Sequence, residues 1–585
     1  MIAALGVAPV VLVTLFVGLR GVAAMRTTSD FLVASRRVSP LLNSAAVSGE
    51  YLSAASFLGV AGLVVKDGIG SLWYPVGFTA GYVAMLVLVA APMRRAGALT
   101  VPDFAEARLA SPVLRRITAV VVLVIGGLYL VPQFRTAGLV LGAVGDTPYW
   151  VGVVIAGVVA ATTLSLGGMR AATYVQAFQF CLKLLLFIVP AAWLVFQVGP
   201  AARSDAVHPE PFTHFAAETT VEFRIGATLD VREPTTVRAG GVTEVWQPGR
   251  RTVAENTTVV FPAGASVPGV GEAHPPGAPG WERPTLDLRD AGYPVLSTWA
   301  VLVATMLGTM GLPHVLMRFH TSPDGRAARR TAALTVVLLS VFYLFPGIYG
   351  VFGAVLVPHL YLSNATDTAV VALPAAVDPG PLGTVFTVLL TAGSFAAFLA
   401  TSLGLLLAVA GAISHDLLAG GLWQLRVAVL AAAAVVVVLA LPAVALDAGV
   451  LVTWGFTVAA STFCPLLVLG IWWPRLTSTG AVCGVLAGLL ASAGAIATTL
   501  FGPPLRGLAA IMVAQPALWS VPLAFATMIL VSLKGKPPAW SRDAMLRLHL
   551  GEQRDYLGTR FLQGHSSRTT GRSSAVRRRA RRFVG

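Results

Sequence analysis

The sequence predicts an all-α protein that crosses a membrane many times. Of its 585 residues, 56% are hydrophobic and only 11% are charged, a composition too apolar for a soluble domain of this length. The apolar residues gather in thirteen runs, each near the roughly twenty residues that a membrane helix requires. Two of these runs are interrupted by glycine together with proline or a charge, which predicts helices that break inside the bilayer.

The predicted spans follow one another along most of the chain. They lie at 3–24, 41–65, 71–92, 117–143, 148–168, 172–198, 296–317, 331–358, 384–413, 425–445, 450–472, 478–501 and 508–533. Arginines gather in alternate short loops, such as Arg36 and Arg37 after the first span and Arg94 and Arg95 after the third. The positive-inside rule therefore predicts a multi-pass protein of the plasma (cell inner) membrane, with its N-terminus outside and its C-terminus in the cytoplasm.

The second span, 41–65, carries a carboxylate, Glu50, next to Gly49 and close to the hydroxyls of Ser53 and Ser56. A charge at bilayer depth costs several kcal/mol unless it meets a partner or a water-filled cavity. Glycine and small hydroxyl residues allow a helix to unwind, and unwinding frees carbonyl oxygens that bind cations where they line a protein cavity. This span therefore predicts the ion and solute site of a transporter.

A second interruption, at 306–314, opens the later group of spans. Two broken helices, each beginning a run of five spans and entering from opposite faces, predict an inverted repeat. Its halves are 41–198 and 296–472. Residues 1–40 then form an extra N-terminal helix with a cytoplasmic loop, and 473–533 form two C-terminal helices.

Two segments differ in composition from the spans. The stretch 199–295 is polar and rich in proline and glycine, and it alternates at 219–225 and 257–261, which predicts an extracellular insertion with β-hairpin content. The tail 534–585 holds 13 Lys and Arg against 3 Asp and Glu, so it accounts for most of the net charge of +15. We expect a disordered cytoplasmic tail that lies on the anionic leaflet of the lipid bilayer rather than on nucleic acid.

Several short motifs in this order resemble those of the sodium/solute symporter family, and most of all its acetate permease and monocarboxylate branch. They are SDFLVA at 29–34 followed by Arg36, GEYLSAASFLG at 49–59, TVPDF at 100–104, LYLVPQ at 128–133, GGMRA at 167–171, LGTMGLPHVLMRF at 307–319 and AISHDL at 412–417. The resemblance covers nearly all of 26–500. It implies a LeuT-type fold with a five-plus-five inverted repeat, and secondary active transport.

The resemblance also implies a cation site made of carbonyl and hydroxyl oxygens. Carried across by register, its residues are Gly49, Leu52, Ala397, Ala400 and Thr401. Ala400 stands where many relatives have a second hydroxyl, and the loss of this ligand argues against sodium. Sodium is still the favoured coupling ion, and a proton is the alternative. No cofactor is expected. The three cysteines lie in apolar runs and suit packing, so no metal site beyond that for sodium is predicted.

The candidate substrate residues are polar or charged groups near the predicted breaks. They are Glu50, Ser53, Ser56, Tyr129, Gln133, Arg135, Lys183 and Thr309. A buried Arg135 would hold a carboxylate by two points, although an arginine near the interface also snorkels outward. Lys183 is expected either to contact substrate or to pair with Glu50, and His314 is interpreted as a structural histidine.

These residues predict a cation-coupled symporter of a small monocarboxylate such as acetate, propionate or pyruvate, working by alternating access. Positive groups suit an anion, and the core offers few aromatic platforms for a sugar. A proton-coupled symporter and a transporter-like nutrient sensor remain as alternatives. The sequence contains no phosphate-binding loop, zinc-protease motif or nucleophile elbow in a fitting context, which argues against an enzyme.

Overall fold

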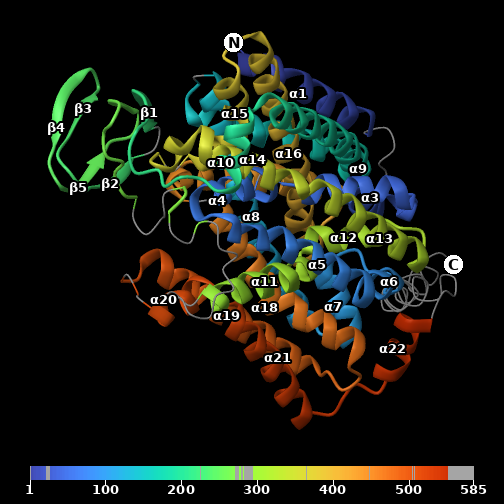
Figure 1. Ribbon diagram of the computed structural model, residues 1–585. Coiled ribbons are helices and arrows are strands. Elements are labelled where there is room, and N and C mark those ends of the chain that lie inside the picture. The colour runs from blue at the N-terminus through green and yellow to red at the C-terminus, as the bar shows by residue number, and fades with distance from the viewer. Residues whose placement is uncertain are drawn as a thin grey trace, which may run out of the picture.

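The computed structural model describes residues 2–21, 27–53, 55–145, 147–223, 226–270, 276–278, 281, 294–363, 365–446, 448–503, 505 and 507–550. It is a bundle of helices with a small β unit at one side (Figure 1). Within these residues, ten helices are long and apolar enough to cross a membrane, and one bent pair makes an eleventh. The all-α, multi-pass architecture predicted from the sequence is therefore confirmed.

The first half of the predicted repeat begins with the bent pair. α3 (Pro40–Tyr51) is followed by one π-helical turn at Ala55–Gly59 and by α4 (Val60–Asp67), and the two arms of the span meet at 62°. The half continues with α5 (Trp73–Leu88), α8 (Pro112–Gly145) and α9 (Tyr149–Gln197).

α9 contains two of the predicted spans in one continuous stretch of 49 residues. A helix of that length would reach roughly 70 Å, more than twice the hydrocarbon thickness of a bilayer. Gly168 divides it, because its φ of 52° and ψ of −156° are not helical. Such positive φ values favour glycine. The two predicted spans, 148–168 and 172–198, thus meet at this residue.

The second half begins with α11 (Pro294–Gly311) and α12 (Pro313–His320), which are separated at Leu312, where ψ is 118°. Pro313 explains this break, since the residue before a proline is pushed towards extended conformations. The half continues with α13 (Gly325–Phe342), α14 (Leu344–Leu356), α16 (Pro381–Gly411), α17 (Leu422–Ala440) and α18 (Ala448–Trp472).

The ends of the chain add further helices. α1 (Ile2–Gly21) precedes the repeat, and α19 (Ser478–Phe501) follows it. The predicted last span, 508–533, is wrong as a single helix: it forms α20 (Gly507–Ala514) and α21 (Ala517–Lys534), because Pro516 interrupts it. The short helices are α2 (Thr28–Val33), α6 (Ala90–Arg95), α7 (Val101–Leu109), α10 (Pro200–Val207), α15 (Ala369–Val377) and α22 (Ser541–Leu550).

The centre of the bundle is built around α16 and α18, which are almost completely buried. α3 packs against α9, α16 packs against α8 and α9, and α11 packs against α5 and α18. Both broken helices therefore lie against long helices that come from distant parts of the chain. This arrangement places the freed backbone of the first break in the protein interior.

The described part of the predicted insertion contains six short strands. β1 (Thr219–Phe223), β6 (Thr257–Phe261), β3 (Thr235–Ala239) and β4 (Val242–Trp246) form one antiparallel sheet in that order, and β2 (Ala227–Val231) pairs with β5 (Gly249–Val253). Tyr361 and Leu362 of the helical body complete the apolar core of this unit. The predicted basic tail lies outside the described residues from 551 onward.

Candidate functional site

The first broken helix opens between Leu52 and Ser53. α3 ends at Tyr51, and Leu52 leaves the helical region with a ψ of 75° while its N–H still bonds to the carbonyl of Ser48. A helix terminus leaves carbonyl oxygens without backbone partners, and inside a membrane protein those oxygens need another donor or a cation. The partner found here comes from α9.

That partner is the amine of Lys183. Its Nζ donates to the carbonyl oxygen of Gly49 at 2.6 Å and to that of Leu52 at 2.8 Å, and the side chain is fully buried. α9 comes close because residue 49 is a glycine: a Cβ there would clash with the carbonyl of Gln176. Two carbonyl groups that the resemblance assigns to the coupling cation are thus bonded to a side-chain nitrogen of the chain itself.

The α16 side of the predicted cation site lies at the same junction. Thr401 Oγ1 donates to the carbonyl of Glu50 at 2.6 Å. The carbonyl of Ala400 accepts a bond of 2.6 Å from Gln176 Nε2, and Ala397 is buried one turn earlier on α16. The polar groups of α3, α9 and α16 therefore bond directly to one another.

Glu50 forms an ion pair with a residue that the sequence argument did not place in the site. Its Oε2 lies 2.6 Å from Nε of Arg318, and each side chain is only 1% exposed. Arg318 Nη1 also donates to Thr173 Oγ1 at 2.9 Å. The signal was available, because a carboxylate at bilayer depth needs a cation and Arg318 follows the second break within the 307–319 motif. Lys183 thus remains outside this pair.

Arg135, the predicted anchor of a substrate carboxylate, also has an internal partner. Its Nη1 lies 3.2 Å from Oδ2 of Asp367, and its Nε donates to the carbonyl of Val444 at 3.1 Å. The guanidinium is 1% exposed. Asp367 belongs to a short turn, Thr366–Thr368, that immediately precedes α15.

Hydroxyl groups and aromatic rings surround the break on its other side. Tyr129 OH donates to Ser53 Oγ at 3.4 Å, and the N–H of Ser56 bonds to Ser53 Oγ at 3.2 Å. Tyr51 OH and Thr309 Oγ1 are 2.6 Å apart, which links the two broken helices. Four of the predicted substrate residues, Ser53, Ser56, Tyr129 and Thr309, thus lie at the break.

The remaining predicted residues and rings complete this environment. Gln133 is buried one turn beyond Tyr129 on α8, and the ring of His314 packs edge-on against Tyr129 with 5.5 Å between centroids. Phe456 packs against Tyr51, Tyr129 and Phe78. The break is therefore bordered by hydroxyls within an aromatic cluster.

Two of the short sequence motifs meet at another place in the fold. Asp416, from the AISHDL motif, accepts a bond of 3.0 Å from Thr100 Oγ1, at the start of the TVPDF motif. Arg115 bridges the same carboxylate at 3.0 Å and Glu106 at 2.8 Å. This network ties α7 and α8 to the end of α16.

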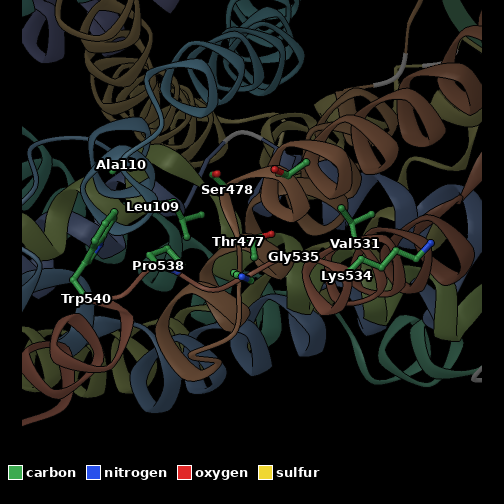
Figure 2. Close-up of a pocket in the computed structure, with 11 residues that line it drawn as sticks. Leu109, Ala110, Thr477, Ser478, Val531, Lys534, Gly535, Pro538 and Trp540 are labelled. Atoms are coloured by element: carbon green, nitrogen blue, oxygen red, sulfur yellow. The ribbon is translucent and has the colours of Figure 1, made fainter.

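A cavity of about 580 Å³ lies apart from the broken helices (Figure 2). It is lined by the end of α7, the start of α19 and the link from α21 to α22, including Thr477, Lys534 and Trp540. No residue of α3, α9 or α11 lines it. Because it contacts neither break, the candidate site is the junction around Gly49 and Leu52 instead.

The chain is similar to known proteins over most of its length. The model of the family described as "Sodium:solute symporter family" matches residues 31–237 and 288–488. A monocarboxylic acid transporter of Corynebacterium glutamicum is 28% identical over 556 residues, 90% of each chain. An uncharacterised symporter of Bacillus subtilis is 28% identical over 527 residues, 86% of this chain and 88% of its own.

A solved structure shares the fold. A Na⁺-coupled sialic acid symporter, in a substrate-bound outward-open state, superposes with a TM-score of 0.64 over 92% of this chain and 98% of its own, at 13% sequence identity. At that identity the likeness concerns the fold alone. It agrees with the architecture predicted from the two broken helices.

Proposed function

Because the chain belongs to the sodium:solute symporter family, which consists of transporters and not enzymes, we propose that it carries a small monocarboxylate across the cell membrane together with a cation. The named monocarboxylic acid transporter at 28% identity supports this class of substrate. Transport proceeds by alternating access around the two broken helices, with the N-terminus outside and the C-terminus inside, as the arginine distribution predicts.

The observation that carries the proposal is that the two helix ends at the first break favour opposite charges. The C-terminal end of α3 turns the carbonyls of Gly49 and Leu52 towards a cation, the ammonium of Lys183. The arm that follows the break begins with the hydroxyls of Ser53 and Ser56, and the N-terminal end of a half-helix attracts negative charge. One broken helix thus offers adjacent environments for a cation and for a carboxylate.

The surroundings of the break favour a small anion with a short apolar tail. Ser53, Ser56 and Tyr129 supply hydroxyl donors, while Phe78 and Phe456 supply apolar surface. Sites of this kind combine a few placed polar groups with apolar walls. Acetate, propionate and pyruvate all fit that description.

The cation acts where α3, α9 and α16 meet, at Gly49, Leu52, Ala397, Ala400 and Thr401. Sodium is the ion that the family implies. The proton is a second candidate, and the specific observation that favours it is the bonding of Lys183 to two of these five residues.

Counterflow in proteoliposomes tests the proposed function. Vesicles that contain the full-length protein and unlabelled acetate should take up labelled acetate faster than protein-free vesicles, and unlabelled pyruvate outside should compete. Counterflow requires a carrier, so it also separates this proposal from a nutrient sensor. Well-folded protein that exchanges none of acetate, propionate and pyruvate would contradict the proposal.

A further inference from the structure

We propose that the ammonium of Lys183 takes the place of the coupling sodium ion, so that the protein couples transport to protons bound and released at this amine. The inference rests on the proposed function and names its coupling ion. It follows from the position of one nitrogen atom, which bonds to the carbonyls of Gly49 and Leu52 at 2.6 and 2.8 Å.

A lysine ammonium is a suitable substitute for a hard monovalent cation. It is a compact point charge with three donors, and it binds carbonyl oxygens as a cation does. Lys183 is fully buried, and it forms no ion pair within the part of the chain that the structure describes. The carboxylate nearest in sequence to its partners, Glu50, is bonded to Arg318 instead. Carbonyl dipoles alone therefore stabilise the charge on Lys183.

A sodium ion cannot share these carbonyls with the ammonium. Two positive charges a few ångströms apart in a buried site repel each other strongly, since little water screens them. The α16 groups are occupied as well: Thr401 Oγ1 is bonded to the carbonyl of Glu50, and the carbonyl of Ala400 to Gln176. In the conformation described, the backbone carbonyls of Gly49, Glu50, Leu52 and Ala400 therefore all accept bonds from donors of the chain itself.

Because this cation belongs to a lysine, it can also release its proton. An amine gives up its proton, whereas the guanidinium groups of Arg135 and Arg318 stay charged in a protein. Helices packed against α9 carry further charged or titratable groups: Glu50 and Tyr51 on α3, Arg115, Arg116, Tyr129 and Arg135 on α8, Asp30 on α2, Arg426 on α17, and Tyr349 on α14. Glu50 and Arg135 are already in ion pairs, and α16 carries no charged residue.

The proton cycle follows from the two hydrogen bonds. Facing outward, the Lys183 amine takes one proton from external water, and the resulting ammonium draws the carbonyls of Gly49 and Leu52 towards α9. Facing inward, it returns that proton to internal water. The neutral amine then holds these carbonyls weakly, because the charge-assisted part of each bond is lost. One proton thus crosses with each cycle in which the carboxylate crosses.

Proteoliposomes with separately imposed sodium and proton gradients test this inference. Labelled pyruvate and labelled acetate are the probes, and uptake into protein-free vesicles is subtracted because protonated acids cross bilayers unaided. The wild-type protein should accumulate label when the outside is acidic, stop when a protonophore is added, and respond equally to a sodium gradient and a choline gradient. Accumulation that requires sodium and ignores the proton gradient would overturn the inference.

Two substitutions test whether the Lys183 amine is the group that carries the coupled proton. Lys183→Met removes the amine, and Lys183→Arg keeps a positive charge that does not release its proton. Lys183→Met should reduce proton-driven accumulation by about tenfold or more, the loss expected when charge-assisted hydrogen bonds disappear. Lys183→Arg should reduce it as strongly, because its guanidinium does not release the proton that has to be carried. Lys183→Arg should retain counterflow, which needs no net proton movement. Lys534→Met, at an exposed lysine outside the site, should change neither measurement.

The outcomes separate the two proposals. A wild-type protein without counterflow of any monocarboxylate would refute the proposed substrate class. Counterflow together with undiminished proton-driven accumulation in either Lys183 variant would refute the inference alone. If both variants fail to fold, the inference is still tested by comparing accumulation in the wild-type protein under a sodium gradient and under a choline gradient.

Discussion

Glu50 on the first broken helix and Arg318 on the second form an ion pair of 2.6 Å, and each side chain is 1% exposed. The pair joins α3 to α12, which the sequence assigns to opposite halves of the inverted repeat. It also fixes the only carboxylate of the 49–59 motif. The charge of Lys183 must consequently be stabilised by backbone carbonyls.

Glu50→Gln should destabilise the protein strongly, because it leaves the Arg318 guanidinium buried without its carboxylate. Breaking a buried ion pair by removing one partner costs about 3–5 kcal/mol. Thermal unfolding of the purified protein in detergent measures this loss. Adding Arg318→Gln should recover part of the stability, since no uncompensated charge then remains. The matched control is Glu244→Gln. Glu244 forms an exposed ion pair with Arg251, and losing it should cost less than about 1 kcal/mol. Equal losses of stability in Glu50→Gln and Glu244→Gln would contradict the prediction.

Gly49→Ala should abolish transport and lower the unfolding temperature. The new Cβ would meet the backbone carbonyl of Gln176, so α9 would have to move away and carry the Lys183 amine with it. Gly127→Ala on α8 is the control, because nothing lies within 4 Å of a Cβ at that position. Uptake and unfolding temperature should be unchanged in this variant, and an active Gly49→Ala protein would show that the close approach of α9 is not required.

Arg135→Gln and Asp367→Asn should affect transport to the same degree if the main partner of Arg135 is Asp367. The double variant should then be no worse than either single one, since all three lack the same ion pair. Michaelis constants for acetate and pyruvate give the comparison. A Michaelis constant that rises roughly ten- to a hundredfold in Arg135→Gln, with Asp367→Asn near wild type, would instead assign Arg135 to the substrate carboxylate.

Lys183→Ala should create a sodium site where the wild type has none. The carbonyls of Gly49 and Leu52 would lose their donor, and the nearby hydroxyl of Thr401 would supply a third oxygen. A ligand that binds only the folded state stabilises it. Sodium chloride should therefore raise the unfolding temperature of Lys183→Ala more than choline chloride does. An equal sodium-specific shift in the wild-type protein would contradict this expectation.

The sequence predicted the two breaks because their causes are local. Gly49 with its neighbouring serines, and Pro313 after Leu312, act on the backbone within a few residues. The positions of most spans follow from hydrophobic runs in the same way. The two predicted spans of α9 are separated only by the non-helical backbone of Gly168, and Pro516 divides the last predicted span, so the ends of the helices depend on single residues.

The partners of the buried charges could not be predicted in this way. Lys183 was expected to contact either substrate or Glu50, and which of these it meets depends on how α9 is rotated against α3. That rotation is set by tertiary packing, including the contact of Gly49 with Gln176. Arg318 entered the sequence analysis only as part of the 307–319 motif; the need of Glu50 for a cation makes it a candidate partner, but only the packing of α3 against α12 brings the two side chains together.

Simultaneous uptake of radiolabelled Na⁺ and a labelled monocarboxylate by the wild-type protein tests the central claim most directly. The vesicles hold an alkaline interior, the outside is acidic, and protein-free vesicles supply the blank. If the Lys183 ammonium stands in for sodium, the carboxylate accumulates while Na⁺ uptake stays at the blank level. Na⁺ that enters in a fixed ratio to the carboxylate would contradict the account and return the carbonyls of Gly49 and Leu52 to a sodium ion.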